Sequence, residues 1–121
     1  MTRPVRICKT FDFDAAHSLP SLPKSHKCHR LHGHTYRVDV VLQGEPDERG
    51  MVADYAEIAA AWQVVDGLLD HRHLNEIEGL ENPTTEVLAP FIFDLLVDTL
   101  PALHRVRIYE SSTTWCEFPV E

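Results

Sequence analysis

Two segments near the start of this chain alternate apolar and polar residues over an unusual length. Apolar side chains hold one parity of both segments: Val5, Ile7, Phe11 and Phe13 in the first, and Tyr36, Val38, Val40 and Leu42 in the second. A period of two over such a length is typical of a long β-strand with one buried face. The sequence therefore predicts strands over residues 5–17 and 31–44, separated by a loop that contains Pro20 and Pro23.

Two later segments have helical periodicity. Residues 54–69 predict an amphipathic helix, with Asp54 as N-cap and Glu57 three residues later. A second helix is expected from Thr84 or Thr85 to Leu100, with Pro90 causing a kink or a late start. The expected buried stripes are Tyr55, Ile58, Ala59, Trp62, Val65 and Leu69 in the first helix, and Val87, Leu88, Phe91, Ile92, Leu95 and Leu96 in the second.

The C-terminal part predicts two more strands, one around Val106 and Ile108 and a shorter one over residues 114–119. The order strand, strand, helix, helix, strand, strand indicates an α+β fold: a four-stranded antiparallel sheet with both helices on one face. With 121 residues, we expect a single domain over residues 1–121. The other face of the sheet would be exposed in a monomer, which suggests assembly.

Charge and cysteine content narrow the possible functions. The net charge of −8 argues against a nucleic-acid binder or a basic membrane-surface protein, because both need a cationic face. No apolar run reaches the length of a membrane span, and the N-terminal segment lacks the apolar core of a signal peptide. Three widely spaced cysteines do not suggest a disulfide framework. A cytoplasmic location is expected.

Histidine is unusually frequent, and seven of the eight histidines lie between His17 and His73. His32 and His34 are two apart on a predicted strand, so their side chains point to the same face. His17 ends the first strand, which a hairpin-like pairing would place beside them. Three imidazoles without a fourth protein ligand are typical of a catalytic zinc site with one open position. Iron or manganese, or incidental surface histidines, are the alternatives.

Cys28 lies among cationic residues, in the sequence His26-Lys27-Cys28-His29-Arg30. Such neighbours favour the thiolate, which is the reactive form of cysteine. Two other interpretations stay open at this point. Cys28 is also compatible with an exposed cysteine in a basic loop, or with a fourth zinc ligand that would make the site structural.

Asp70 and His71 are adjacent at the end of the first predicted helix. A carboxylate beside an imidazole holds its tautomer and raises its basicity. A histidine at a helix C-terminus also interacts well with the helix dipole, which is a purely structural explanation. The sequence alone does not separate the two.

Three further residues have weaker signals. Glu110 follows the third predicted strand, where its carboxylate could accept paired N–H donors from a heterocycle edge or be an ordinary exposed glutamate. Thr84 and Thr85 follow Asn82-Pro83 at a helix start, where capping explains them fully.

Taken together, these motifs resemble the 6-pyruvoyl-tetrahydropterin synthase superfamily, and within it the bacterial branch that forms 6-carboxy-5,6,7,8-tetrahydropterin in queuosine biosynthesis. The matching segments span nearly the whole chain in the order of the family. They are FDFDAAH at residues 11–17, CHRLHGH at 28–34, LDH at 69–71, LENPTTE at 80–86 and the strand that leads to Glu110.

The resemblance implies a role for each matched residue. The zinc ligands would be His17, His32 and His34, the catalytic thiol would be Cys28, and a proton relay with that thiol would be completed by Asp70 and His71. It further implies that Glu110 anchors the pterin ring and that Thr84 and Thr85 line the pterin pocket.

The resemblance also implies an assembly and a reaction. The fold would be the tunnelling fold, a homohexamer of two stacked trimers with active sites at subunit interfaces. The zinc-dependent lyase would convert 7,8-dihydroneopterin triphosphate to 6-carboxytetrahydropterin, acetaldehyde and triphosphate. Two alternatives are a 6-pyruvoyl-tetrahydropterin synthase, which keeps the side chain, and a non-catalytic zinc-binding module with Cys28 as fourth ligand.

Overall fold

The two long alternating segments are adjacent antiparallel strands in the computed structural model, which describes residues 3–121. They are β1 (Val5–His17) and β2 (His32–Gly44), within one residue of the predicted bounds. Their register places Val5 opposite Gly44 and His17 opposite His32, so β1 is paired along its whole length. This register brings the two ends that carry histidines side by side.

The sheet has five strands in the order β3-β1-β2-β4-β5. Antiparallel pairs join β2 to β4 (Leu103–Tyr109) and β4 to β5 (Trp115–Phe118), as predicted. The prediction of a four-stranded antiparallel sheet is nevertheless wrong, because β3 (Arg72–His73) adds a parallel strand on the free side of β1. Two residues are too few to show a period, so this polar segment looks like a connector in the sequence.

Both helices are where the periodicity places them. The first, α1 (Tyr55–Leu69), starts at a complete capping box formed by Asp54 and Glu57. The second, α2 (Thr85–Leu96), starts at the Thr84 cap, so Pro90 lies inside the helix and does not delay its start. It ends before the predicted Leu100, which precedes a proline and is therefore disfavoured in helical conformation.

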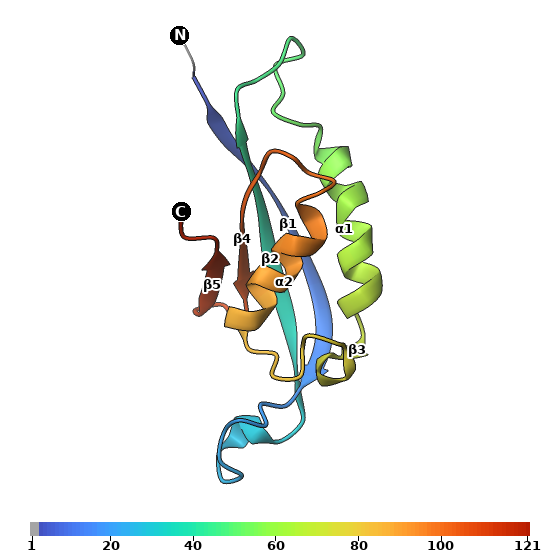
Figure 1. Ribbon diagram of the computed structural model, residues 1–121, viewed down its shortest axis with the longest axis vertical. Helices are drawn as coiled ribbons and strands as arrows, with labels where there is room; N and C mark the ends of the chain where they lie inside the picture. The colour runs from blue at the N-terminus through green and yellow to red at the C-terminus, as the bar shows by residue number, and fades with distance from the viewer. Residues whose placement is uncertain (1–2) are drawn as a thin grey trace.

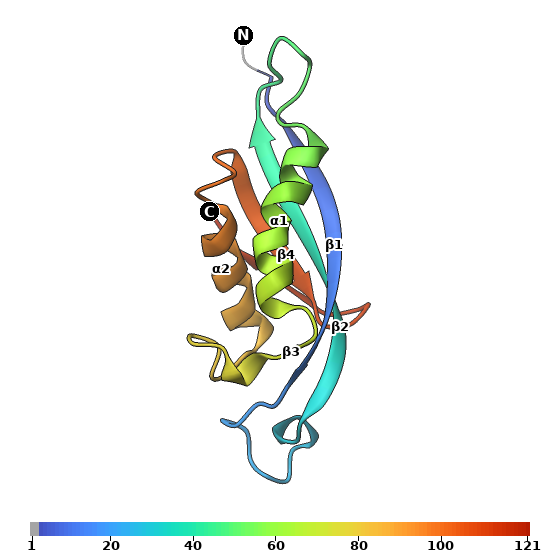
Figure 2. The same ribbon diagram turned by 90° about the vertical axis from the view of Figure 1, so that its right-hand side faces the viewer.

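The helices form one layer on one face of the sheet, as Figure 2 shows from the side, and the core residues come from both layers. Phe11 of β1 stacks on Trp62 of α1 with ring centroids 4.6 Å apart. The prediction that Tyr55 belongs to this layer is wrong, because Tyr55 is the first residue of α1 and is 53% exposed. The fully buried side chains include Tyr36, Val38, Val40, Ile58, Val65, Leu88, Ile92, Leu96, Val106 and Ile108.

Neither helix covers the opposite face of the sheet (Figures 1 and 2). On this face Thr10 donates a hydrogen bond to Asp39 over 2.8 Å, and the Arg37 guanidinium lies 3.8 Å from the ring centroid of Tyr109. The expected uncovered face is therefore present in residues 3–121, and its composition is polar. Neither helix in this range has the length and apolar character needed to cross a membrane.

The end of the sheet that carries the histidines is surrounded by irregular segments (Figure 1). The loop between β1 and β2 contains a single 3-10 turn, η1 (Lys27–His29). A second turn, η2 (Leu74–Glu76), directly follows β3 and precedes the segment that leads to α2. These segments and the strand ends form the surroundings of the candidate site.

Candidate metal centre and active site

His17, His32 and His34 come together at the end of the β1–β2 pair. His17 is the last residue of β1 and lies opposite His32, while His34 is two residues further along β2 on the same face. The three offer ligand atoms that all lie within 4.8 Å of one another. The register of two strands therefore creates a group that could bind a metal ion.

The outer nitrogens of two of these rings are bonded to backbone carbonyls. Nδ1 of His17 donates to the carbonyl of Pro83 over 3.0 Å, and Nδ1 of His32 donates to the carbonyl of Arg30 over 2.7 Å. These bonds leave both Nε2 atoms as lone-pair donors, 3.0 Å apart. A carbonyl that fixes the tautomer and orientation of a histidine is the usual outer partner of a metal ligand.

The third ring, His34, has an unsatisfied nitrogen at the centre of the cluster. Its Nε2 is buried and has no hydrogen-bond partner among the residues that the structure describes, and the nearest Glu110 oxygen is 3.6 Å away. A buried polar atom without a partner is costly unless something binds it. The donor set and this free nitrogen fit a metal ion.

Burial favours the neutral form of two of the three imidazoles. Loss of hydration on burial lowers the pKa of His17, whose side chain is completely buried, and it also lowers the pKa of His34. The neutral imidazole is the form that binds metal. The Tyr36 hydroxyl lies 3.2 Å from Nδ1 of His17, and burial raises the pKa of this phenol, so it stays uncharged.

A hollow of about 410 Å³ opens beside the histidines and contains Cys28. Cys28 is in η1, where its N–H donates to Nδ1 of His26 over 3.0 Å. Among residues 3–121 the group of metal-ligating atoms contains the three imidazoles and not Cys28. The structure therefore places Cys28 on the wall of the hollow. The lining residues are Lys27, Cys28, Arg30, Leu31, His32, His34 and Glu110.

Asp70 and His71 form a carboxylate–imidazole pair directly before β3, at the edge of β1 that faces away from β2. Oδ2 of Asp70 accepts from Nδ1 of His71 over 2.8 Å, while the N–H of Asp14 donates to Oδ1 of Asp70 over 3.0 Å. The Asp14 bond and the His71 bond lower the pKa of Asp70, and Asp70 in turn raises the pKa of His71. The pair therefore consists of an ionised carboxylate and an imidazole that is more basic than an ordinary histidine.

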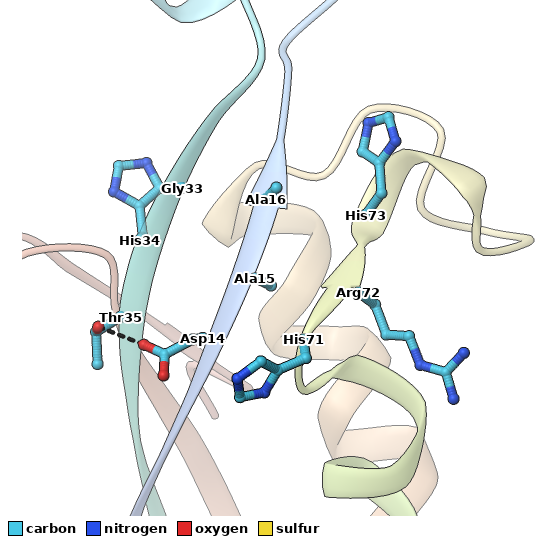
Figure 3. Close-up of a pocket in the computed structure, with 9 residues that line it drawn as sticks. All are labelled: Asp14, Ala15, Ala16, Gly33, His34, Thr35, His71, Arg72 and His73. Carbon is cyan, nitrogen blue, oxygen red and sulfur yellow. Dashed lines mark hydrogen bonds between the residues drawn. The ribbon is translucent and has the colours of Figure 1, made fainter.

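The backbone of β1 holds His71 in an uncommon conformation. His71 has a φ of 58°, and its N–H donates to the carbonyl of Asp14 over 2.6 Å. The left-handed region is uncommon for residues other than glycine, so this contact helps to maintain it. Figure 3 shows the His71 ring beside Asp14, whose carboxylate accepts a hydrogen bond from Thr35, in a hollow of about 580 Å³.

Cys28 and His71 line different hollows. The two hollows share only His34, the smaller one contains Cys28, and the larger one contains His71. Asp14 and Thr35, which surround His71, have the strand parity opposite to that of His17 and His34. The chain alone therefore does not bring the thiol and the carboxylate–imidazole pair into one hollow.

The remaining predicted residues, Glu110, Thr84 and Thr85, have different surroundings. Glu110 follows β4 and lines the hollow of Cys28. Thr84 accepts the N–H of Val87 over 3.3 Å as the cap of α2, and Thr85 donates to its neighbour Glu86 over 3.1 Å. Neither threonine is among the residues that line the two hollows.

Sequence reasoning missed the two carbonyl groups that orient His17 and His32. They belong to Pro83 and Arg30, and backbone acceptors leave no side-chain signal. The position of Pro83, directly before the helix cap, is the nearest available indication, because it fixes the backbone next to the site.

The structure combines an α+β layer pair, three histidines that could bind a metal ion, and a hollow lined by Cys28 beside them. This combination defines a candidate metal-dependent enzyme. The family model for 6-pyruvoyl tetrahydropterin synthase matches residues 6–121. The chain belongs to the 6-pyruvoyl tetrahydropterin synthase family.

Similar proteins agree with this assignment. The chain is 40% identical over 115 residues to 6-carboxy-5,6,7,8-tetrahydropterin synthase of Synechocystis sp., covering 89% of this chain and 88% of the relative. It is 38% identical over 122 residues to dihydroneopterin monophosphate aldolase of Pyrococcus furiosus, covering 96% and 95%. Among solved structures, Caenorhabditis elegans 6-pyruvoyl tetrahydropterin synthase has a TM-score of 0.89 at 28% identity, covering 99% and 98%.

Proposed function

We propose that this chain is a 6-carboxy-5,6,7,8-tetrahydropterin synthase, a lyase of the queuosine pathway. It would convert 7,8-dihydroneopterin triphosphate and one water to 6-carboxytetrahydropterin, acetaldehyde and triphosphate. The observation that carries the proposal is the hollow in which Cys28 lies beside the His32 and His34 imidazoles. The 40% identity to a synthase of this name supports the choice of reaction.

The three imidazoles are proposed to hold zinc. His17 and His32 offer Nε2 atoms whose orientation is fixed from outside, and the unpartnered Nε2 of His34 completes the set. Zinc bound there would act as a Lewis acid toward the oxygens of the substrate side chain. We expect His17→Ala/His32→Ala protein to lose zinc by metal analysis; full occupancy in this double variant would overturn the assignment.

We propose separate roles for several side chains that line the hollow beside the metal site. Cys28 is proposed to remove a carbon-bound proton from the side chain as a thiolate. Glu110 is proposed to accept N–H donors from the pterin ring with its two carboxylate oxygens. Lys27 and Arg30 line the same hollow and offer positive charge to the triphosphate, whereas Lys24 is not among its lining residues.

The proton relay is proposed to form between chains. Because Cys28 and His71 line different hollows of one chain, a second copy must supply the Asp70–His71 pair to the hollow of Cys28. The uncovered polar face and the free edges of the sheet leave room for such contacts. We propose a homohexamer built from two trimers, in which each active site lies at a subunit interface and Thr84 and Thr85 face the pterin.

Two other activities have specific support. The structural similarity to a 6-pyruvoyl tetrahydropterin synthase favours triphosphate elimination with the side chain retained. The 38% identity to a dihydroneopterin monophosphate aldolase favours an aldol cleavage instead, which would release a two-carbon aldehyde that keeps its phosphate. A non-catalytic zinc module is disfavoured, because Cys28 is outside the group of metal-ligating atoms within residues 3–121.

The products distinguish these activities. Incubation with 7,8-dihydroneopterin triphosphate, followed by mass spectrometry of the pterins, is expected to show 6-carboxytetrahydropterin. A pterin that retains a three-carbon pyruvoyl side chain would transfer the assignment to the pyruvoyl-forming enzyme. A 6-hydroxymethyl pterin formed from dihydroneopterin monophosphate would favour the aldolase.

A further inference from the structure

The side-chain amide of Asn75 joins two segments that are far apart in the sequence. Asn75 is in η2, and its Oδ1 accepts the N–H of Ser18 over 2.9 Å. Its Nδ2 donates to the carbonyl of Ser18 over 2.8 Å and to the carbonyl of Glu81 over 3.2 Å. One amide thus forms three hydrogen bonds with backbone groups.

These two segments carry the two partners of one hydrogen bond in the metal cluster. Ser18 directly follows His17, and Glu81 is two residues before Pro83. Nδ1 of His17 donates to the carbonyl of Pro83 over 3.0 Å. Asn75 therefore closes a loop of contacts that runs through Ser18 and His17 to Pro83, and back through Glu81.

The backbone that carries Asn75 is itself anchored in the core. Leu74 precedes it and is completely buried, as is Leu80 beside Glu81. The N–H of Leu80 also donates to the carbonyl of Ile77 over 2.9 Å, which keeps this segment folded against η2. Because the backbone on both sides of Asn75 is held in place, its side-chain amide can fix the positions of the groups that it binds.

We propose that Asn75 is a positioning residue of the metal centre. Its amide holds the end of β1 against the segment before α2, so that the His17 ring keeps Nδ1–H on Pro83 and Nε2 free for metal. This inference rests on the proposed metal centre and adds a residue that acts on it through His17. Among the described residues, the side-chain hydrogen bonds of Asn75 go to Ser18 and Glu81 and not to the three imidazoles.

Only an amide provides what these contacts require. The Ser18 N–H needs an acceptor, and the two carbonyls need a donor on the same side chain. Asn75→Asp has nearly the same shape but turns an oxygen toward the carbonyls of Ser18 and Glu81, while Asn75→Leu removes all three bonds. Both variants should loosen the His17–Pro83 contact.

The test compares these variants with a matched change at the other end of the sheet. Asp47 also bonds two backbone N–H groups of one loop, those of Arg49 and Met51 at 2.8 and 3.2 Å. Asp47→Ala therefore removes side-chain-to-backbone bonds of the same kind, together with the Asp47–Arg49 ion pair, at the end of the sheet away from the histidines. Three quantities are measured in each full-length protein: the zinc dissociation constant by chelator competition, the unfolding midpoint without metal, and the His17 tautomer by ¹⁵N NMR.

We expect both Asn75 variants to bind zinc at least about 10-fold more weakly than wild type, the usual effect of losing an outer partner of a ligand. Without metal, His17 in both Asn75 variants should also show a fraction of the Nε2–H tautomer. Asp47→Ala should change neither the zinc dissociation constant nor the His17 tautomer. Zinc affinity within about twofold of wild type in a folded Asn75 variant, or an equal loss in Asp47→Ala, would overturn the inference. If wild type binds no zinc, the metal centre fails, and an unchanged His17 tautomer in the variants would then also reject the role of Asn75.

Discussion

His17 is a single side chain whose state depends on three separate effects. Its place at the end of β1 sets the direction of the ring, Pro83 fixes the tautomer, and burial lowers its pKa. Each effect keeps Nε2 as a free, neutral donor. The candidate site thus depends on contacts behind the histidines as much as on the histidines themselves.

Substitution of Cys28 separates the two roles that the sequence leaves open for the thiol. We expect Cys28→Ala to lower kcat at least about 100-fold, the usual effect of removing a general base. Zinc content should stay at the wild-type level, because Cys28 is not in the group of metal-ligating atoms. Metal analysis beside the kinetic assay checks both quantities. Loss of zinc in proportion to activity would make Cys28 a ligand.

The pKa of His71 should lie above the ordinary value of histidine. The hydrogen bond and charge of Asp70 raise its pKa most, and the more distant carboxylates of Asp14 and Asp66 act in the same direction. NMR titration of the His71 ring should show a high pKa in wild type and a lower one in Asp70→Asn. Asp66→Asn is the control and should lower it less. An unchanged pKa in Asp70→Asn would show that the pair does not interact in solution.

At the level of elements, the long periodic segments of the sequence are sufficient to predict the main strands and the first helix. The alternation over β1 and β2 and the helical spacing in α1 each extend over several repeats, so their bounds could be predicted closely. The two residues of β3 contain no complete repeat, and their strand exists because the backbone meets Ala15 and Ala16 of β1. Such a contact is tertiary and has no local signal.

The same distinction applies to the candidate site. Strand parity was enough to place His32 and His34 on one face, and pairing with β1 added His17. The Pro83 carbonyl and the Asn75 amide could not be predicted, because their roles depend on loops that approach from distant parts of the chain. The separation of Cys28 from His71 likewise follows from the folded sheet.

The start of α1 offers a test of element stability that leaves the site untouched. The Asp54 carboxylate accepts the N–H of Ala56 over 2.9 Å as part of the capping box. We expect Asp54→Ala to lower the free energy of unfolding by about 1 kcal/mol in urea denaturation, with unchanged zinc content. Gln63→Ala, at an exposed position of the same helix, should change it by less than about 0.5 kcal/mol. Equal effects of the two variants would argue against the cap.

At the level of the whole molecule, the proposed site needs two chains. Cys28→Ala and His71→Ala proteins should each be nearly inactive, because each lacks one part of the relay. Mixed oligomers made by co-expression in equal amounts should recover about a quarter of wild-type activity, since random pairing leaves that share of interfaces with both groups intact. Light scattering should give a homohexamer in every case. Mixed oligomers as inactive as their parents would place the relay within one chain.

In the proposed reaction, the chain cleaves the pterin side chain and eliminates triphosphate together. The most direct measurement follows both released products from 7,8-dihydroneopterin triphosphate: acetaldehyde with coupled alcohol dehydrogenase, and triphosphate by ion chromatography. We predict equal amounts of acetaldehyde and triphosphate in the zinc-loaded wild type, and neither above background in Cys28→Ala. Triphosphate without acetaldehyde, with the three-carbon side chain still on the pterin, would contradict the proposed function.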